Sequence, residues 1–156
     1  MMPGIQQQAA KMTREAWEGL MRTAAFVPEE KRDWVPQGKA RTLHDILAEC
    51  AVLPGRWHAL LLGNEALPPP DRQGYERAKA ELNTLDKIKA AGDAGIARLC
   101  ELIEAVPDER LEETRAMPWG QTMTLADRLF ICYWNLTYHD GQVNYLQMLL
   151  GDIEMH

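Results

Sequence analysis

Residues 124–151, TLADRLFICYWNLTYHDGQVNYLQMLLG, are the stretch that decides the fold. Its apolar and near-apolar residues recur in alternating steps of four and three, at positions 125, 129, 132, 136, 139, 143, 146 and 150. This spacing is typical of an amphipathic helix with a narrow seam that packs against neighbouring helices. Position 139 of the seam is His139 rather than an aliphatic residue, and Asn135 lies one turn earlier. A polar residue on a buried seam is either satisfied by hydrogen bonds or carries chemistry.

The same kind of pattern predicts three further helices, over 5–25, from 42 onwards and over 84–105. The second helix begins with T-L-x-D, a sequence typical of a helix N-cap. Its predicted apolar stripe is Ile46, Cys50, Leu53, Trp57 and Leu60. Pro54 interrupts this helix, so we expect a kink or a short break at 53–55. In the third helix, Gly92 and Gly95 are small enough to let a neighbouring helix approach closely.

The segments between the helices read as loops. The longest, 63–82, contains Leu-Pro-Pro-Pro-Asp at 67–71, and its length indicates a crossover along the bundle, with a helical turn or two over 71–80. Residues 107–123 are predicted to be a loop, and no convincing alternating strand pattern occurs anywhere in the chain. The sequence therefore predicts a single all-α domain over 1–156, built as a four-helix bundle.

The composition narrows the function classes. The 156 residues are 46% hydrophobic and 26% charged, with a net charge of −6, which is typical of a soluble globular protein. No basic cluster indicates a nucleic-acid surface, and no apolar run is long enough to span a membrane. Residues 1–16 lack the apolar core of a secretion signal. Three cysteines fall on apolar stripes and are expected to be reduced, buried thiols of a cytoplasmic protein: Cys50, Cys100 and Cys132.

One set of polar residues is a candidate for chemistry. Asn135 and His139 are four positions apart, so their side chains can converge on one point of the helix surface. Glu49 borders the stripe of the second helix and can lean toward them. The three side chains are either metal ligands or a hydrogen-bonded group in which Glu49 and His139 fix the register of the bundle. The other histidines, His44 and His58 among them, are interpreted as surface or boundary residues.

Two segments resemble the DinB-like superfamily of small four-helix bundles. Residues 34–50, WVPQGKARTLHDILAEC, resemble that family's turn into its second helix. Residues 119–151 resemble its final loop and helix, where a Pro-Trp-Gly turn and a T-L start lead to His-x-x-x-His followed by Arg-Gly-Gln. The resemblance implies an up-down-down-up four-helix bundle with a long connection between helices two and three.

The resemblance also implies a metal site. Family members typically hold one divalent metal ion, usually zinc or nickel, with one histidine from helix two and two from helix four. Carried over to this chain, the three positions are Glu49, Asn135 and His139, of which only His139 keeps the histidine. Such a set would bind zinc or nickel far more weakly than three histidines, and a harder ion such as manganese becomes conceivable.

Two function hypotheses follow. The first is a DinB-like protein with a degenerate or absent metal site that binds a small molecule in a pocket between helices two and four. The alternative is a divalent-metal-dependent enzyme resembling the thiol-dependent transferases and isomerases of the superfamily. Because family members often dimerise through their bundle faces, the resemblance also implies a homodimer.

Overall fold

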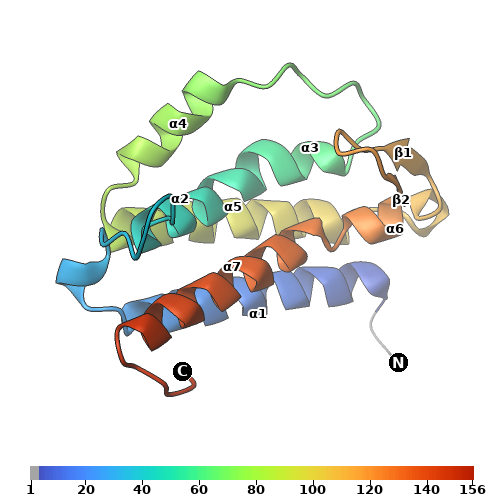
Figure 1. Ribbon diagram of the computed structural model, residues 1–156. Helices are drawn as coiled ribbons and strands as arrows, with labels where there is room; N and C mark the ends of the chain where they lie inside the picture. The colour runs from blue at the N-terminus through green and yellow to red at the C-terminus, as the bar shows by residue number, and fades with distance from the viewer. Residues whose placement is uncertain (1–3) are drawn as a thin grey trace.

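The bundle of this chain, seen in a computed structural model that describes residues 4–156, consists of four long helices (Figure 1). These are α1 (Ile5–Ala25), α2 (Leu43–Leu53), α5 (Leu85–Glu104) and α7 (Ile131–Leu149). In Figure 1, α1 and α7 run in one direction while α2 and α5 run in the other, so the chain order is up-down-down-up. Each of α1 and α2 contacts both α5 and α7. The predicted all-α four-helix bundle is therefore confirmed.

Shorter elements connect the four helices. They are η1 (Glu29–Lys31), η2 (Pro54–His58), α3 (Ala59–Leu61), α4 (Arg72–Glu81), η3 (Asp108–Arg110), β1 (Thr114–Ala116), β2 (Thr122–Thr124) and α6 (Leu125–Arg128). Residues 1–3 lie outside the described range. They belong to the segment 1–16, for which the sequence predicts no secretion signal. None of the helices within residues 4–156 is both long and apolar enough to cross a membrane.

The core forms along the seam that the sequence predicts. Seven of its eight positions are buried: Leu125, Leu129, Cys132, Leu136, His139, Val143 and Leu146. The three cysteines are buried free thiols, as expected. Burial of such apolar side chains is the main favourable term in the stability of the bundle.

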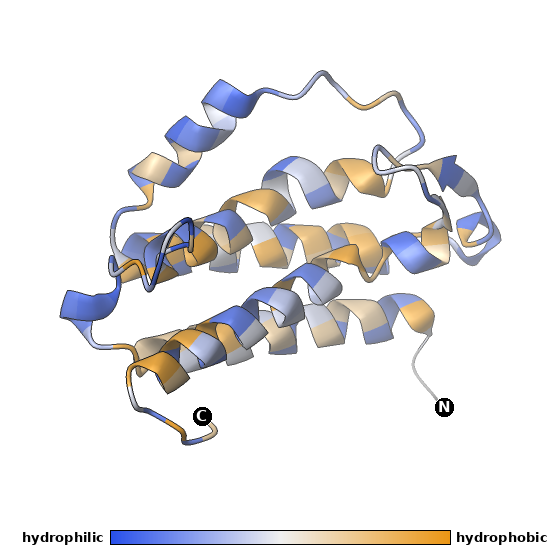
Figure 2. Ribbon diagram, in the orientation of Figure 1, coloured by the Kyte–Doolittle hydropathy of each residue, from blue (hydrophilic) through white to orange (hydrophobic). Residues whose placement is uncertain are grey.

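α2 and α5 are neighbours that run in the same direction. The connection between them must therefore return along the bundle, from the end of α2 to the start of α5. Its helical part, α4, has ten residues, so the prediction of one or two turns is too short. The side chain of Asp71 caps α4 by accepting a hydrogen bond from the Gly74 amide at 2.8 Å. Figure 2 shows α4 as largely hydrophilic, in keeping with its position outside the four-helix core.

Pro54 changes the geometry of the second helix. The predicted kink takes the form of a π-helical turn, η2, which holds one residue more than an α-helical turn. The buried face passes through Ala51, Pro54, His58 and Leu61, one position after the predicted Leu53, Trp57 and Leu60. Leu60 is 41% exposed, so the predicted stripe through Trp57 and Leu60 is wrong beyond the proline.

The fourth predicted helix is not continuous. It divides into α6 and α7 at Phe130, whose φ of −96° and ψ of 0° depart from α-helical values. Thr124 forms a full capping box with Asp127 at the start of α6. Arg128, at the end of α6, is buried and donates to the carbonyl oxygens of Leu61 at 2.9 Å and Gly63 at 3.0 Å. A buried guanidinium needs hydrogen-bond acceptors, and the separate turn of α6 places that of Arg128 next to these carbonyl oxygens.

A short hairpin lies where the sequence predicts only loop. β1 pairs antiparallel with β2, with Thr114 opposite Thr124. Gly120 in the connecting turn has a φ of 91°, a conformation that favours glycine. Strands of three residues are too short to show alternation in the sequence, which is why this prediction is wrong.

The close approach expected at Gly92 is present between α5 and α1. A Cβ atom at Gly92 would lie 2.0 Å from a ring carbon of Trp17. The indole is held in place because its Nε1 donates to Asp93 at 2.8 Å. Gly141 in α7 is the opposite case, since no described neighbour lies within 4 Å of a Cβ built there.

We expect Gly92→Ala to lower the free energy of unfolding by about 1–3 kcal/mol, because the added methyl group overpacks the α1–α5 contact. The matched control Gly141→Ala is expected to raise it by up to ~1 kcal/mol through helix propensity alone. Urea denaturation followed by circular dichroism measures both. Equal effects of the two substitutions would show that α1 and α5 do not approach closely at Gly92.

Candidate functional site

A cavity of about 790 Å³ lies between the α2–η2 segment and the α6–α7 segment. α4 and the hairpin supply the rest of its wall. Its lining residues are Glu49, Leu53, Trp57, His58, Leu61, Tyr75, Trp119, Gln121, Met123, Asp127, Phe130, Ile131, Trp134 and Asn135. Most of this surface is aromatic or aliphatic, with a few polar groups set into it, which is the usual character of a small-molecule site.

Glu49 and His139 are in direct contact. His139 is only 3% exposed, and its Nε2 lies 3.0 Å from Oε1 of Glu49. A carboxylate can only accept hydrogen bonds, so Nε2 carries the proton in this contact. Nδ1 of His139 lies 2.8 Å from Oε1 of Gln142. The second Glu49 oxygen, Oε2, pairs with the Arg41 guanidinium at 2.9 Å.

These contacts keep Glu49 ionised. Burial on its own would raise the pKa of this carboxyl, but the hydrogen bond from His139 and the charge of Arg41 outweigh it and lower the pKa to about 2. Tyr75 of α4 lies against the same carboxylate and also lowers its pKa. Conversely, burial and the nearby Glu49 charge raise the pKa of the Tyr75 hydroxyl. Both carboxylate oxygens are thus engaged with groups of the protein.

Asn135, the third predicted site residue, lines the same cavity as Glu49. Its Oδ1 is buried and has no hydrogen-bond partner among residues 4–156. The structure therefore joins Glu49 to His139 directly and adds Asn135 to the wall beside them. Asn135 lies one helical turn from His139, and its amide oxygen is an acceptor buried in the cavity wall.

His58 is the residue of the cavity that the sequence interpretation missed. It is 5% exposed and lines the cavity, so the interpretation as a surface or boundary residue is wrong. Its Nδ1 is buried without a partner in the described part of the chain. Burial lowers the pKa of His58 to about 4, against the opposing charge of Glu49, so the imidazole is neutral at neutral pH. His58 continues the buried series Leu47, Ala51 and Pro54 in helical steps of four, three and four, and this spacing was the available signal.

The three predicted ligand positions suit a zinc or nickel ion poorly. Within residues 4–156, no group of three histidine, cysteine, aspartate or glutamate side chains is arranged to hold a metal ion. Glu49 shares its charge with Arg41, whose guanidinium repels a cation, and the amide of Asn135 is a weak ligand for these metals. Of the three, His139 is the one strong ligand for them.

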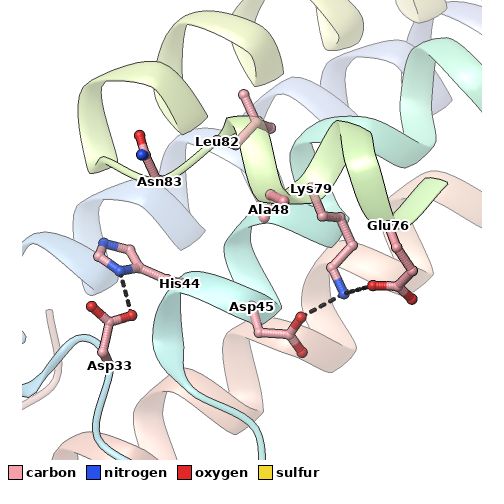
Figure 3. Close-up of a pocket in the computed structure, with 9 residues that line it drawn as sticks. Asp33, His44, Asp45, Ala48, Glu76, Lys79, Leu82 and Asn83 are labelled. Atoms are coloured by element: carbon pink, nitrogen blue, oxygen red, sulfur yellow. Dashed lines mark hydrogen bonds and ion pairs between the residues drawn. The ribbon is translucent and has the colours of Figure 1, made fainter. Parts of the chain in front are cut away.

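A second, smaller cavity of about 330 Å³ lies beside α2 and α4 (Figure 3). His44 Nδ1 lies 2.8 Å from Asp33 there, and Lys79 of α4 contacts Asp45 at 2.5 Å and Glu76 at 3.8 Å. His44 is a boundary residue, as expected. Because these charges pair with one another, we interpret this region as the attachment of α4 to α2, which in turn positions Tyr75 in the larger cavity.

The fold is similar to two solved structures. One is YfiT from Bacillus subtilis, described as a probable metal-dependent hydrolase with an unusual four-helix bundle topology. It matches with a TM-score of 0.76 and 15% identity, over 94% of this chain and 87% of YfiT. The other is a mycothiol-dependent maleylpyruvate isomerase, with a TM-score of 0.65 and 13% identity. That match covers 91% of this chain but 61% of the isomerase, and at these identities both likenesses show the fold alone.

At the level of sequence, no protein of curated function matches significantly. The family model of the DinB superfamily, however, matches residues 7–143. The matched range includes the four long helices except the first two residues of α1 and the last six of α7, and it contains Glu49, Asn135 and His139. Since this match spans most of the chain and the four-helix topology agrees with it, the chain belongs to the DinB superfamily.

Proposed function

We propose that this protein binds a small molecule with a largely apolar body and a polar group in the cavity between α2 and α7, and that its metal site is degenerate or absent. The observation that carries the proposal is Asn135 Oδ1, which is buried at the cavity and unpartnered within the described chain. A buried carbonyl oxygen without a hydrogen bond costs about 1–3 kcal/mol. A ligand that donates a hydrogen bond to it removes this cost.

The aromatic rings at the cavity also support a ligand. Trp119 of the hairpin and Trp134 of α7 are 50% and 64% exposed, although indole rings are usually well buried. A ligand between them would remove apolar surface from water, at about 25 cal/mol per Å². The volume of about 790 Å³ falls within the usual range for small-molecule pockets, roughly 300–1,000 Å³.

A divalent-metal-dependent enzyme is the second candidate function. It is favoured by the position of the unpartnered Asn135 Oδ1, which lies on α7 one helical turn before His139. One of the similar structures, YfiT, is also described as a probable metal-dependent hydrolase. The Arg41–Glu49 ion pair counts against this candidate, because a metal ion would have to compete with the guanidinium for the carboxylate.

The homodimer inferred from the family resemblance stays a prediction. α7 carries exposed apolar side chains outside the large cavity that are available to such an interface: Tyr138, Tyr145, Met148 and Leu149. The cytoplasmic location likewise stays a prediction.

We expect Met123→Trp to abolish small-molecule binding, because the larger side chain fills the cavity from β2. A fragment library screened by saturation-transfer NMR should yield ligands of wild-type protein that bind Met123→Trp at least about tenfold more weakly. Met148→Trp, the same change at an exposed position of α7 outside the cavity, should leave their binding unchanged. An absence of binding fragments, or binding that Met123→Trp does not affect, would rule out this pocket.

For the metal site, we expect wild-type protein purified without a metal-affinity tag to carry less than about 0.1 equivalent of zinc, nickel or manganese by elemental analysis. Asn135→His would add a second imidazole at i, i+4 and should raise zinc affinity at least ~100-fold. Adding His139→Ala to that variant should remove the gain. Near-stoichiometric metal in wild type that is lost in His139→Ala would favour the enzyme instead.

A further inference from the structure

We infer that the ligand of the large cavity is an organic cation, a protonated amine carried on an apolar body, whose ammonium group binds beside Glu49 and Asn135. This inference rests on the proposed function and names the chemical class of its ligand. Three independent properties of the cavity lining lead to it: its charge, its hydrogen-bonding groups and its aromatic surface.

The charged side chains that line the cavity are acidic. They are Glu49 and Asp127, and no lysine or arginine occurs among the described lining residues. Arg41 pairs with Oε2 of Glu49 from outside the cavity lining and offsets part of its charge, whereas Asp127 forms no ion pair within residues 4–156. An anionic ligand would therefore enter a pocket that offers no cationic side chain. Burying a charge without an opposite partner is strongly unfavourable, so this lining selects against anions.

Two hydrogen-bond acceptors belong to the α2 and α7 sides of the cavity. The carboxylate of Glu49 accepts only, and the buried Asn135 Oδ1 is an acceptor left without a donor in the part of the chain that the structure describes. An ammonium group has three donors and no acceptor, which matches this arrangement. A carboxylate or phosphate group next to these two side chains would place acceptors against acceptors.

Aromatic rings line the same space. Tyr75, Phe130 and three tryptophans belong to the lining: Trp57, Trp119 and Trp134. The faces of such rings attract cations through their quadrupoles, most strongly for tryptophan, and this attraction grows when the cation is partly removed from water. Trp119 Nε1 donates to Gln121 Oε1 at 3.1 Å, an interaction that orients this ring at the hairpin.

Three probes of matched size separate the charge classes: phenethylamine, which is protonated at pH 7, 2-phenylethanol, which is neutral, and 3-phenylpropanoate, which is anionic. Titrations followed by NMR should show the amine binding wild-type protein at least about tenfold more tightly than the alcohol, and the anion most weakly. Asn135→Leu should weaken amine binding several-fold, while Tyr145→Ala, an exposed aromatic residue outside this cavity, should leave it unchanged.

A charge substitution at the cavity gives a second, independent readout. Gln121 is exposed, so Gln121→Lys can place a positive charge at the lining without disturbing the core, and Gln121→Met is its uncharged control. Both substitutions remove the hydrogen bond from Trp119, so the difference between them isolates the charge. Compared with Gln121→Met, we expect Gln121→Lys to bind the amine more weakly and the anion more tightly, with little difference for the alcohol. Equal affinities of all three probes, or tightest binding of the anion, would overturn the cation assignment while leaving the pocket intact. If no probe binds, or if Met123→Trp leaves all three bound, the proposed function and this inference both fail.

Discussion

The hydrogen bond between His139 and Glu49 joins α7 to α2, and the cavity depends on it because both helices supply its walls. Sliding either helix by one residue would separate the two side chains and leave a carboxylate half-buried without its imidazole partner. Removing one member of a buried pair costs about 3–5 kcal/mol, whereas replacing both members by apolar residues can be neutral. We therefore interpret the pair as a contact that selects one register of the bundle. Arg41 reinforces it from the loop before α2 by engaging the second carboxylate oxygen.

The fold could be predicted from the sequence wherever periodicity carries the signal. The seam of residues 124–151 is buried at seven of its eight expected positions, and the small residue Gly92 packs against Trp17. The differences arise where a side chain overrides periodicity. Pro54 inserts a π-helical turn, and the buried Arg128 ends α6 beside the carbonyl oxygens of residues 61 and 63, with no glycine or proline to mark the break. Neither a π-helical turn nor a buried cation is visible in the pattern of apolar residues.

Part of the candidate site could also be predicted, because it depends on the same helical periodicity. The pairing of Glu49 with His139 is one of the two alternatives that the sequence leaves open, and it follows from two stripes that face each other. His58 escaped notice because the predicted stripe was one position off: Ala51, Pro54, His58 and Leu61 are buried, rather than Leu53, Trp57 and Leu60. Tyr75 comes from a helix beyond a proline-rich connection, and such a long-range contact depends on the path of the loop, which local sequence does not encode.

The central claim, that Glu49 is held as a carboxylate by His139 and Arg41, is tested most directly by the pH dependence of unfolding in wild type and Glu49→Gln. The folded-state pKa of about 2 lies below the ordinary 4.5, so the ionised form stabilises the fold fully above about pH 4.5 and this stability is lost as the pH falls through 2. Other carboxyl groups titrate in both proteins, so the difference between the two curves isolates Glu49. The account predicts that wild type loses on the order of 3 kcal/mol more than Glu49→Gln between pH 6 and pH 2. Parallel curves for the two proteins would contradict it.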